Sequence, residues 1–180
     1  GMKVCVLASG SAGNSIFVQQ GITKVLVDAG LAGKRIEERL QAVGVDGNEL
    51  HALVVTHEHS DHIHGVGVLA RRYGLPVWMT RGTYDGSKRI FRGRERIRII
   101  ENDEGFDIGD LHFQPFSISH DAIDPVNCFF HAHADSRFDL LRCCTKIGHL
   151  DNDSIKLYLG HDLFIDGEDR YDTSHHNKHH

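Results

Sequence analysis

Residues 56–65, THEHSDHIHG, contain four histidines and two acidic residues. Imidazole and carboxylate groups are the ligands that zinc and similar metals prefer. In an irregular turn after a strand, His57 and His59 can both point at one ion. Asp61 and His62, at the start of a following helix, can face a second ion. The spacing indicates a metal centre; the alternative is a solvated polar loop in which the histidines bind nothing.

The chemistry that this stretch predicts is metal-assisted hydrolysis. Two metal ions roughly 3.5–4 Å apart would hold a bridging hydroxide and stabilise an attacked phosphoryl or carbonyl group. Asp61 is therefore assigned a catalytic role as well as a ligand role. Glu58 and Ser60 fall between the ligand positions, and we expect them to face away or to orient the ligands. Thr56 is expected to cap the turn.

Short strands and helices alternate around the metal-binding stretch. Apolar runs predict strands over residues 3–8, 15–19, 24–28, 50–56, 76–80, 97–101, 111–118, 126–133, 140–145 and 162–166. Helical spacing predicts helices over 33–43, 63–73 and 152–159, and residues 107–110 predict a turn. This pattern predicts one α+β domain over residues 1–180, with a disordered histidine-rich tail at 173–180.

The composition is that of an ordinary globular protein, with 40% hydrophobic and 25% charged residues among 180. No apolar run reaches the length of a membrane span, and the start lacks the pattern of a secretory signal, so we expect a cytoplasmic protein with no membrane partner. The four cysteines show neither paired C-x-x-C spacing nor a disulfide framework.

Basic residues gather in one segment, 81–98. Seven basic residues against two acidic ones give this segment a charge of +5, whereas the whole chain carries −5. Arg94, Arg96 and Arg98 alternate with isoleucines, so on a strand they would share one face. Such a stripe could contact the phosphates of nucleic acid. The alternative is an edge strand that its arginines protect from pairing.

The pattern H-x-H-x-D-H after an apolar strand resembles the metallo-β-lactamase superfamily, whose fold is an αβ/βα sandwich with the metals at one sheet edge. The resemblance implies two further site residues. Asp28, in LVDAG, matches an early aspartate that supports the metal-binding loop. His120, in SISHD, matches the third histidine of the first metal site, although a lone histidine at this place would suggest a surface residue. His57, His59 and His120 would then share one ion.

The resemblance extends to one bacterial branch of the superfamily, the YycJ/WalJ type. It rests on VLASGSAGNS, VLVDAGLAGKRIEERL, THEHSDHIHGVGVLARRYGLPVW and SHDAIDPV, and continues more weakly through TKIGHLDNDSIKLYLGHDLFID. It implies 5′→3′ exonuclease activity on DNA. It also implies zinc as the metal, with manganese as the alternative, and one or two ions.

The second half of the chain departs from the family pattern. Thr145-Lys-Ile-Gly148 places Lys146 where the family has a metal-bridging aspartate, and a charged ammonium cannot bridge two cations. A shifted alignment would let Asp151 or Asp153 take that place. We also expect a shortened second half without the family's last metal-binding histidine. The remaining histidines available there are His131, His133, His149, His161, His175 and His176.

Three functions follow from these patterns. The first is a metal-dependent phosphodiesterase or exonuclease that acts on nucleic acid through a metal-bound hydroxide. The second is the hydrolysis of a small thioester, lactone or lactam, which uses the same ligand pattern. The third is a degenerate, non-catalytic member that binds nucleic acid or one metal. The oligomeric state stays open.

Overall fold

A computed structural model describes residues 3–101, 104–117, 122, 126–132, 164–165 and 171–172. The large sheet contains strands β1 (Lys3–Ala8), β2 (Ser15–Gln20), β3 (Thr23–Val27), β4 (Ala52–Val54), β5 (Val77–Met79) and β6 (Ile97–Ile99), which lie side by side in chain order. The pairs β1–β2 and β2–β3 are antiparallel. From β3 to β6 the strands run parallel, so their carboxyl ends meet at one edge of the sheet.

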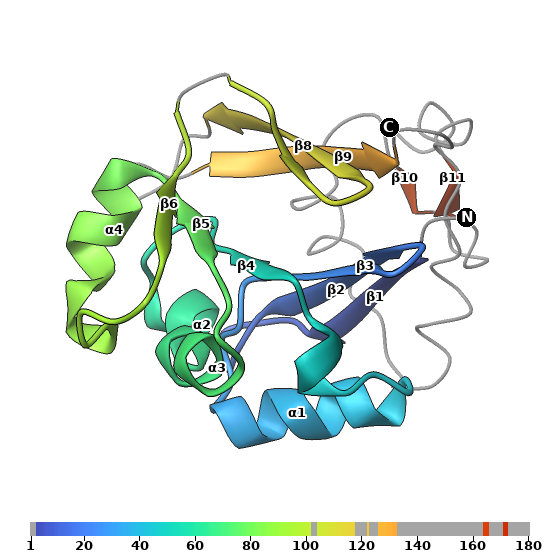
Figure 1. Ribbon diagram of the computed structural model, residues 1–180, viewed down its shortest axis with the longest axis horizontal. Coiled ribbons are helices and arrows are strands. Elements are labelled where there is room, and N and C mark those ends of the chain that lie inside the picture. The colour runs from blue at the N-terminus through green and yellow to red at the C-terminus, as the bar shows by residue number, and fades with distance from the viewer. Residues whose placement is uncertain are drawn as a thin grey trace.

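Helices form the parallel crossovers. They are α1 (Gly33–Ala42), α2 (Ser60–Ile63), α3 (Val66–Tyr73) and α4 (Arg81–Ser87), with short 3₁₀ turns η1 (Gly47–Glu49) and η2 (Lys88–Ile90). The helices α1 and α3 bury apolar side chains such as Ile36, Leu40 and Leu69. Figure 1 shows α1 to α3 covering one face of the large sheet. None of the described helices is long and apolar enough to cross a membrane.

A smaller antiparallel sheet covers the opposite face of the large sheet (Figure 1). It consists of β7 (Phe106–Ile108), β8 (Leu111–Ser117) and β9 (Val126–Ala132), and a separate pair joins β10 (Phe164–Ile165) to β11 (Tyr171–Asp172). Stacked rings connect the two sheets. The rings of Trp78 and Phe106 lie 4.5 Å apart between centroids, and those of Phe106 and Phe113 lie 5.3 Å apart. The large sheet is therefore covered on both faces.

Most of the predicted elements are confirmed within these residues, but several differ. The helix predicted over 63–73 begins earlier, at Ser60, and is interrupted after Ile63. Residues 106–108 form β7, and the predicted turn is confined to the positions around Gly109, where φ is +53°. The sequence also did not predict α4, which begins where the Thr80 hydroxyl accepts a hydrogen bond from the Thr83 amide at 3.2 Å.

The predicted face of three arginines is wrong. Strand β6 begins only at Ile97, so Arg94 and Arg96 precede it. Arg96 turns back to donate a hydrogen bond to the Gly74 carbonyl at the end of α3, and Arg98 lies in register with Trp78 on β5. Arg94, Arg96 and Arg98 therefore do not lie on one strand. The predicted strand 140–145 and helix 152–159 lie outside the described residues.

Glu95 is an anchor for the basic loop before β6. Its carboxylate accepts hydrogen bonds from the Arg92 amide at 2.9 and 3.0 Å, from the Gly93 amide at 3.1 Å and from Arg71 Nη1 at 2.9 Å. The side chain is only 1% exposed. Burial raises the pKa of Glu95, but the Arg92 amide and the Arg71 guanidinium outweigh it and lower the pKa to about 2. The loop is therefore held by a buried charge.

Replacing Glu95 with glutamine is expected to destabilise the protein by roughly 2 kcal/mol at pH 7, because charge-assisted hydrogen bonds are lost. Since the folded pKa lies below the ordinary 4.5, this stabilisation is present above about pH 4.5 and is lost as the pH falls toward 2. Urea unfolding of both proteins between pH 7 and pH 2.5 measures the difference. A difference in unfolding free energy that stays constant with pH would contradict the assignment. Glu101→Gln, at an exposed position, serves as the control.

Candidate metal centre

The metal-binding stretch lies where the parallel strands β3 and β4 end. Asp28 follows β3 directly, and its amide donates to the Val54 carbonyl of β4 at 2.7 Å. Asp28 adopts a φ of +62°, a left-handed conformation that aspartate tolerates better than most residues. This backbone turn keeps the carboxylate fully buried between the two strand ends. Thr56 and His57 follow β4 at the same edge.

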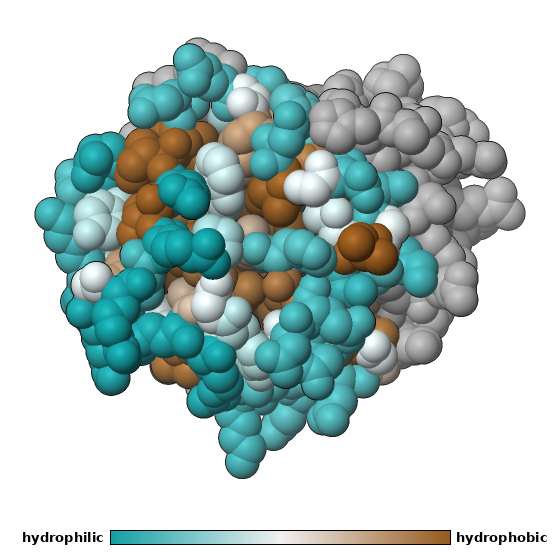
Figure 2. All heavy atoms as spheres, viewed as in Figure 1, coloured by the Kyte–Doolittle hydropathy of each residue, from teal (hydrophilic) through white to brown (hydrophobic). Residues whose placement is uncertain are grey.

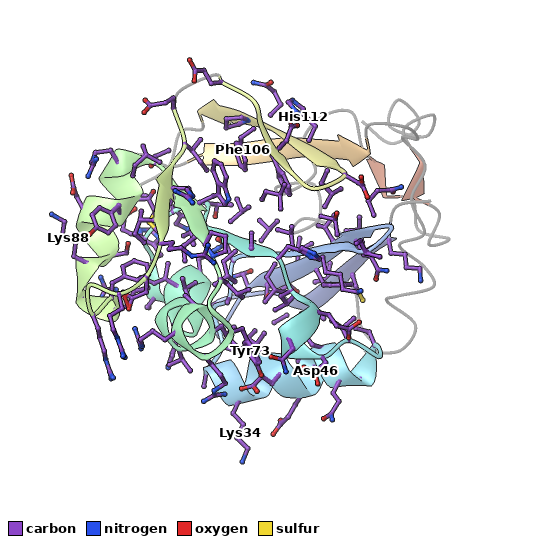
Figure 3. The ribbon with its side chains drawn as sticks, viewed as in Figure 1. Lys34, Asp46, Tyr73, Lys88, Phe106 and His112 are labelled. Carbon is purple, nitrogen blue, oxygen red and sulfur yellow. The ribbon has the colours of Figure 1, made fainter. Side chains whose placement is uncertain are left out.

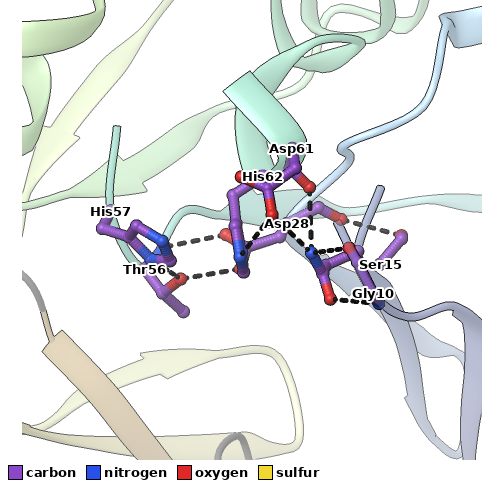
Figure 4. A network of polar contacts seen from close by, with 8 residues as sticks. Gly10, Ser15, Asp28, Thr56, His57, Asp61 and His62 are labelled. Atoms are coloured by element: carbon purple, nitrogen blue, oxygen red, sulfur yellow. Dashed lines mark hydrogen bonds and ion pairs between the residues drawn. The ribbon is translucent and has the colours of Figure 1, made fainter. Parts of the chain in front are cut away.

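The Asp28 carboxylate joins the strand ends to the histidines (Figure 4). Its Oδ1 accepts from the Thr56 amide at 2.8 Å, and its Oδ2 accepts from the Thr56 hydroxyl at 2.7 Å. The same Oδ2 lies 2.6 Å from Nδ1 of His62. A carboxylate can only accept, so His62 carries a proton on Nδ1 and leaves Nε2 to bind another group.

Thr56 extends this network to a second histidine and is more than the predicted cap. Its hydroxyl oxygen lies 3.0 Å from Nδ1 of His57. The single hydroxyl proton of Thr56 goes to Asp28, so the hydroxyl oxygen accepts the Nδ1 proton of His57. His57 therefore also keeps Nε2 unprotonated. Asp28 and Thr56 together set the same tautomer in both rings.

The histidine rings are close to one another. The ring centroids of His57 and His62 lie 3.9 Å apart, and those of His57 and His59 lie 4.9 Å apart. His57 and His62 are buried, whereas His59 is half-buried. Imidazole rings at such distances, with two Nε2 atoms available, have the donor chemistry of a divalent metal site.

Charges in this cluster stabilise one another. Burial raises the pKa of Asp28, but the charge of His62 and the hydrogen bonds from His62 and Thr56 outweigh it, so its pKa is lowered. Burial lowers the pKa of His62, but the carboxylates of Asp28 and Asp61 outweigh it, so its pKa is raised. The pairing of Asp28 with His62 therefore outweighs the effect of burial on the pKa of each group.

Asp61 is held by a residue that the sequence did not single out. The backbone amide of Asn14 donates to the backbone carbonyl of Asp61 at 2.8 Å, and the side-chain Nδ2 of Asn14 donates to Asp61 Oδ2 at 3.1 Å. The Asn14 side chain also exchanges two hydrogen bonds with the Gly10 backbone. Asp61 Oδ2 thereby stays 3.7 Å from Nε2 of His62. The sequence contained one signal for this role: Asn14 ends a Gly/Ser loop directly before the strand β2.

Two glycines let the metal-binding stretch pack against the segment after β3. A Cβ atom on Gly30 would lie 1.7 Å from the Asp61 carbonyl oxygen, and one on Gly65 would lie 2.4 Å from the Leu31 carbonyl oxygen. Both contacts are with backbone atoms, which cannot rotate away. Gly30, the last residue of LVDAG, and Gly65, the last of THEHSDHIHG, are therefore required by close backbone approach.

The described residues supply part of a ligand set. Among them, no three histidine, cysteine or acidic side chains already form a group that could hold a metal. The predicted third ligand, His120, lies outside the described residues, as do Lys146, Asp151 and Asp153. The side chains of His131 and His133 and the later histidines also lie outside them. The donor types at His57, His59, Asp61 and His62 fit a divalent metal, and the grouping needs a further donor from another part of the chain.

The sequence and the fold both point to one family. A family model described as the metallo-β-lactamase superfamily matches residues 8–136. The chain belongs to the metallo-β-lactamase superfamily. This confirms the resemblance read from H-x-H-x-D-H, together with the α+β sandwich that it implied. Membership in the superfamily implies that the chain binds a divalent metal.

Known members of the superfamily extend the comparison. The chain is 42% identical over 129 residues to the exodeoxyribonuclease WalJ of Streptococcus pneumoniae, which covers 69% of this chain and 48% of that protein. It is 40% identical over 139 residues to the exodeoxyribonuclease YycJ of Bacillus anthracis, covering 73% of this chain and 50% of that one. The chain thus spans about half the length of these relatives.

Solved structures of the superfamily share the fold. A B3 metallo-β-lactamase with an active-site glutamic acid matches with a TM-score of 0.60 and 21% identity, covering 71% of this chain and 53% of the other. The metallo-β-lactamase fold protein YhfI of Bacillus subtilis also gives 0.60, at 18% identity, covering 72% and 58%. The shared architecture extends over most of the described residues.

Proposed function

We propose that this chain belongs to a metal-dependent phosphodiesterase that acts on nucleic acid, with exonucleolytic removal of nucleotides from DNA as its reaction. The observation that carries the proposal is the hydrogen-bonded chain from His57 through Thr56 and Asp28 to His62. It fixes two buried imidazoles in the tautomer that a metal requires. The two relatives named exodeoxyribonuclease, at 40% and 42% identity, support nucleic acid as the substrate.

We propose zinc as the metal, with manganese as the alternative, since imidazole and carboxylate donors suit both. His57, His59 and His120 would hold one ion, and Asp61 and His62 would face a second. A bound divalent ion supplies Lewis-acid stabilisation of charge on the phosphoryl group and activation of water.

The residues of the chain have separate tasks in this proposal. Asp28 and Thr56 orient the imidazoles from behind, because their hydrogen bonds reach only the Nδ1 atoms. Asn14 fixes the Asp61 carboxylate, whose Oδ2 lies beside Nε2 of His62. In this proposal Asp61, predicted to be catalytic, would accept a proton from the attacking water through Oδ2.

A direct assay distinguishes the three functions. Chelator-treated protein is incubated with 5′-labelled single-stranded DNA, with and without zinc or manganese, and in parallel with small thioester and lactone substrates. We expect metal-dependent loss of the label from DNA that slows as the salt concentration rises. Hydrolysis of only the small esters, insensitive to salt, would instead support the second function. Binding of DNA without any turnover would support the degenerate member.

We propose that Arg94, Arg96 and Arg98 contact backbone phosphates, although they do not share one strand face. All three are exposed. Arg94 and Arg96 line a hollow of about 200 Å³ together with Arg71 of α3. Figure 2 shows hydrophilic side chains gathered over this side of the molecule, at the lower left of the view. A strand of nucleic acid could follow such a surface.

Alanine at Arg94, Arg96 and Arg98 together is expected to weaken binding of single-stranded DNA and to reduce its salt dependence. Each lost phosphate contact should lower the slope of log affinity against log salt by about 0.7. Fluorescence anisotropy in the presence of a chelator measures binding without cleavage. If the triple variant has the same salt slope as the unaltered protein, the arginines do not contact phosphates. That result would support the alternative, in which they protect an edge strand from pairing.

A further inference from the structure

A hollow of about 300 Å³ lies beside the loop that joins β1 to β2. Its walls come from the end of β1, from the loop itself and from one face of α1. Leu7, Ser9 and Gly13 line the first two walls, and Arg35 and Arg39 line the third. None of its lining residues belongs to the basic segment 81–98. Its charge comes from the two arginines.

Both arginines of the hollow come from α1. Arg35 and Arg39 are four residues apart on α1, so they lie on the same side of the helix. Arg39 Nη1 donates to the Leu7 carbonyl at 2.7 Å, which fixes its guanidinium while its other N–H groups are left to donate. Within the described part of the chain, neither arginine pairs with a carboxylate. Glu37 of the same helix is bonded instead to Arg72 of α3.

The loop that forms one wall of the hollow is bonded to the metal-binding stretch. The Asn14 side chain bridges Gly10 of the loop and Asp61 (Figure 4). Gly13, which lines the hollow, lies against the Gly30 carbonyl and Leu31, the segment on which the metal-binding stretch packs. The hollow and the candidate metal centre therefore share the loop between β1 and β2 and the segment after β3.

We propose that this hollow is an anion site that takes a phosphate group, with Arg35 and Arg39 as its donors. The planar guanidinium has N–H groups in a fixed fork that matches phosphate oxygens, and two such forks on one helix face can hold one phosphate. Where the proposed function holds, the ligand is a backbone phosphate of the nucleic-acid strand whose cleavage occurs at the metal centre. The class of ligand, a phosphate, does not depend on that function.

Titration with inorganic phosphate tests the site without nucleic acid or metal. The side-chain N–H resonances of Arg35 and Arg39, assigned with Arg35→Lys and Arg39→Lys, are followed by ¹⁵N NMR. We expect shifts that saturate at these two residues, while the exposed Arg89 shows only a small, linear change. Shifts at Arg35 and Arg39 that are as small and linear as those at Arg89 would overturn the site.

Binding of a fluorescein-labelled oligothymidylate in the presence of a chelator tests the link to nucleic acid. Arg35→Ala is expected to lower the affinity about tenfold and to reduce the salt slope by about 0.7. Lys34→Ala removes a neighbouring charge of α1 that points away from the body of the protein (Figure 3), and it should change the affinity less than twofold. Equal effects of Arg35→Ala and Lys34→Ala on the affinity would show that the hollow does not contact the nucleic acid.

The two proposals fail in different ways. If phosphate binding saturates but the unaltered protein neither binds nor cleaves DNA, the nuclease function is wrong and the anion site stands. If the protein cleaves DNA while Arg35→Ala behaves as Lys34→Ala does, the nuclease function stands and the nucleic-acid role of the hollow is wrong. Thermal unfolding of each variant shows whether a loss of binding reflects a loss of folded protein.

Discussion

Replacing Gly30 with alanine is expected to destabilise the protein by more than about 4 kcal/mol, enough to prevent stable folding. The added Cβ atom would lie 1.7 Å from the Asp61 carbonyl oxygen and 2.7 Å from the Asn14 amide nitrogen. Relief requires the backbone after β3 to separate from the metal-binding stretch, which breaks the hydrogen bond from the Gly30 amide to the Asn14 carbonyl. Urea unfolding, or the yield of soluble protein, measures the effect.

Gly44→Ala is the matched control for Gly30→Ala. Gly44 has a φ of +78°, so alanine there is strained, but its Cβ atom would meet nothing within 4 Å. We expect a cost of about 1 kcal/mol, typical of left-handed backbone alone. If Gly30→Ala lowered the unfolding free energy no more than Gly44→Ala does, the close packing of Gly30 against Asp61 and Asn14 would be wrong.

Replacing Asp28 with asparagine is expected to lower the affinity for a divalent metal by roughly 10- to 100-fold, the usual effect of losing a group that orients a ligand. Asparagine tolerates the left-handed backbone as aspartate does, so the fold at this position is preserved. Its amide can accept from Thr56 through one oxygen, but its NH₂ group would then face the Nδ1 proton of His62. Relief requires His62 to move its proton to Nε2, where it blocks ligation.

Competition with a chromophoric chelator measures the metal affinity of Asp28→Asn and of the unaltered chain. Asp46→Asn is the control, because Asp46 is an exposed carboxylate that caps η1 and asparagine caps equally well. The control should leave the metal affinity unchanged. An Asp28→Asn chain that folds and binds metal as tightly as the control would show that the carboxylate does not set the histidine tautomers.

The local pattern of the sequence was sufficient to predict that the metal-binding stretch lies between a buried strand and a helix. The buried strand β4 ends at Val54, three residues before His57, and the following helix begins at Ser60. The position of Asp28 came from the family resemblance, since nothing in LVDAG alone indicates a hydrogen bond to His62, 34 residues later. Long-range pairs of this kind depend on which strands become neighbours, and one sequence read alone contains little information about that.

The elements that were missed have a common physical reason. The helix α4 contains two glycines and a threonine and has weak helical propensity, so it depends on the Thr80 cap and on burial of Thr83 and Ser87. The alternation of isoleucines with arginines suggested a shared face for Arg94, Arg96 and Arg98, but the strand begins only at Ile97, after a loop whose amides at Arg92 and Gly93 donate to Glu95. In both places, contacts made after folding override the local pattern.

The measurement that tests the metal centre most directly is the divalent metal content of the chain, by elemental analysis after zinc loading and gel filtration. It compares the unaltered protein with a His57→Ala, His59→Ala double variant. The histidines of residues 173–180 are present in both proteins, so the difference isolates the predicted site. We expect the unaltered chain to retain at least one more zinc ion than the double variant, with both proteins folded. Equal zinc contents in two folded proteins would contradict a metal centre at His57 and His59.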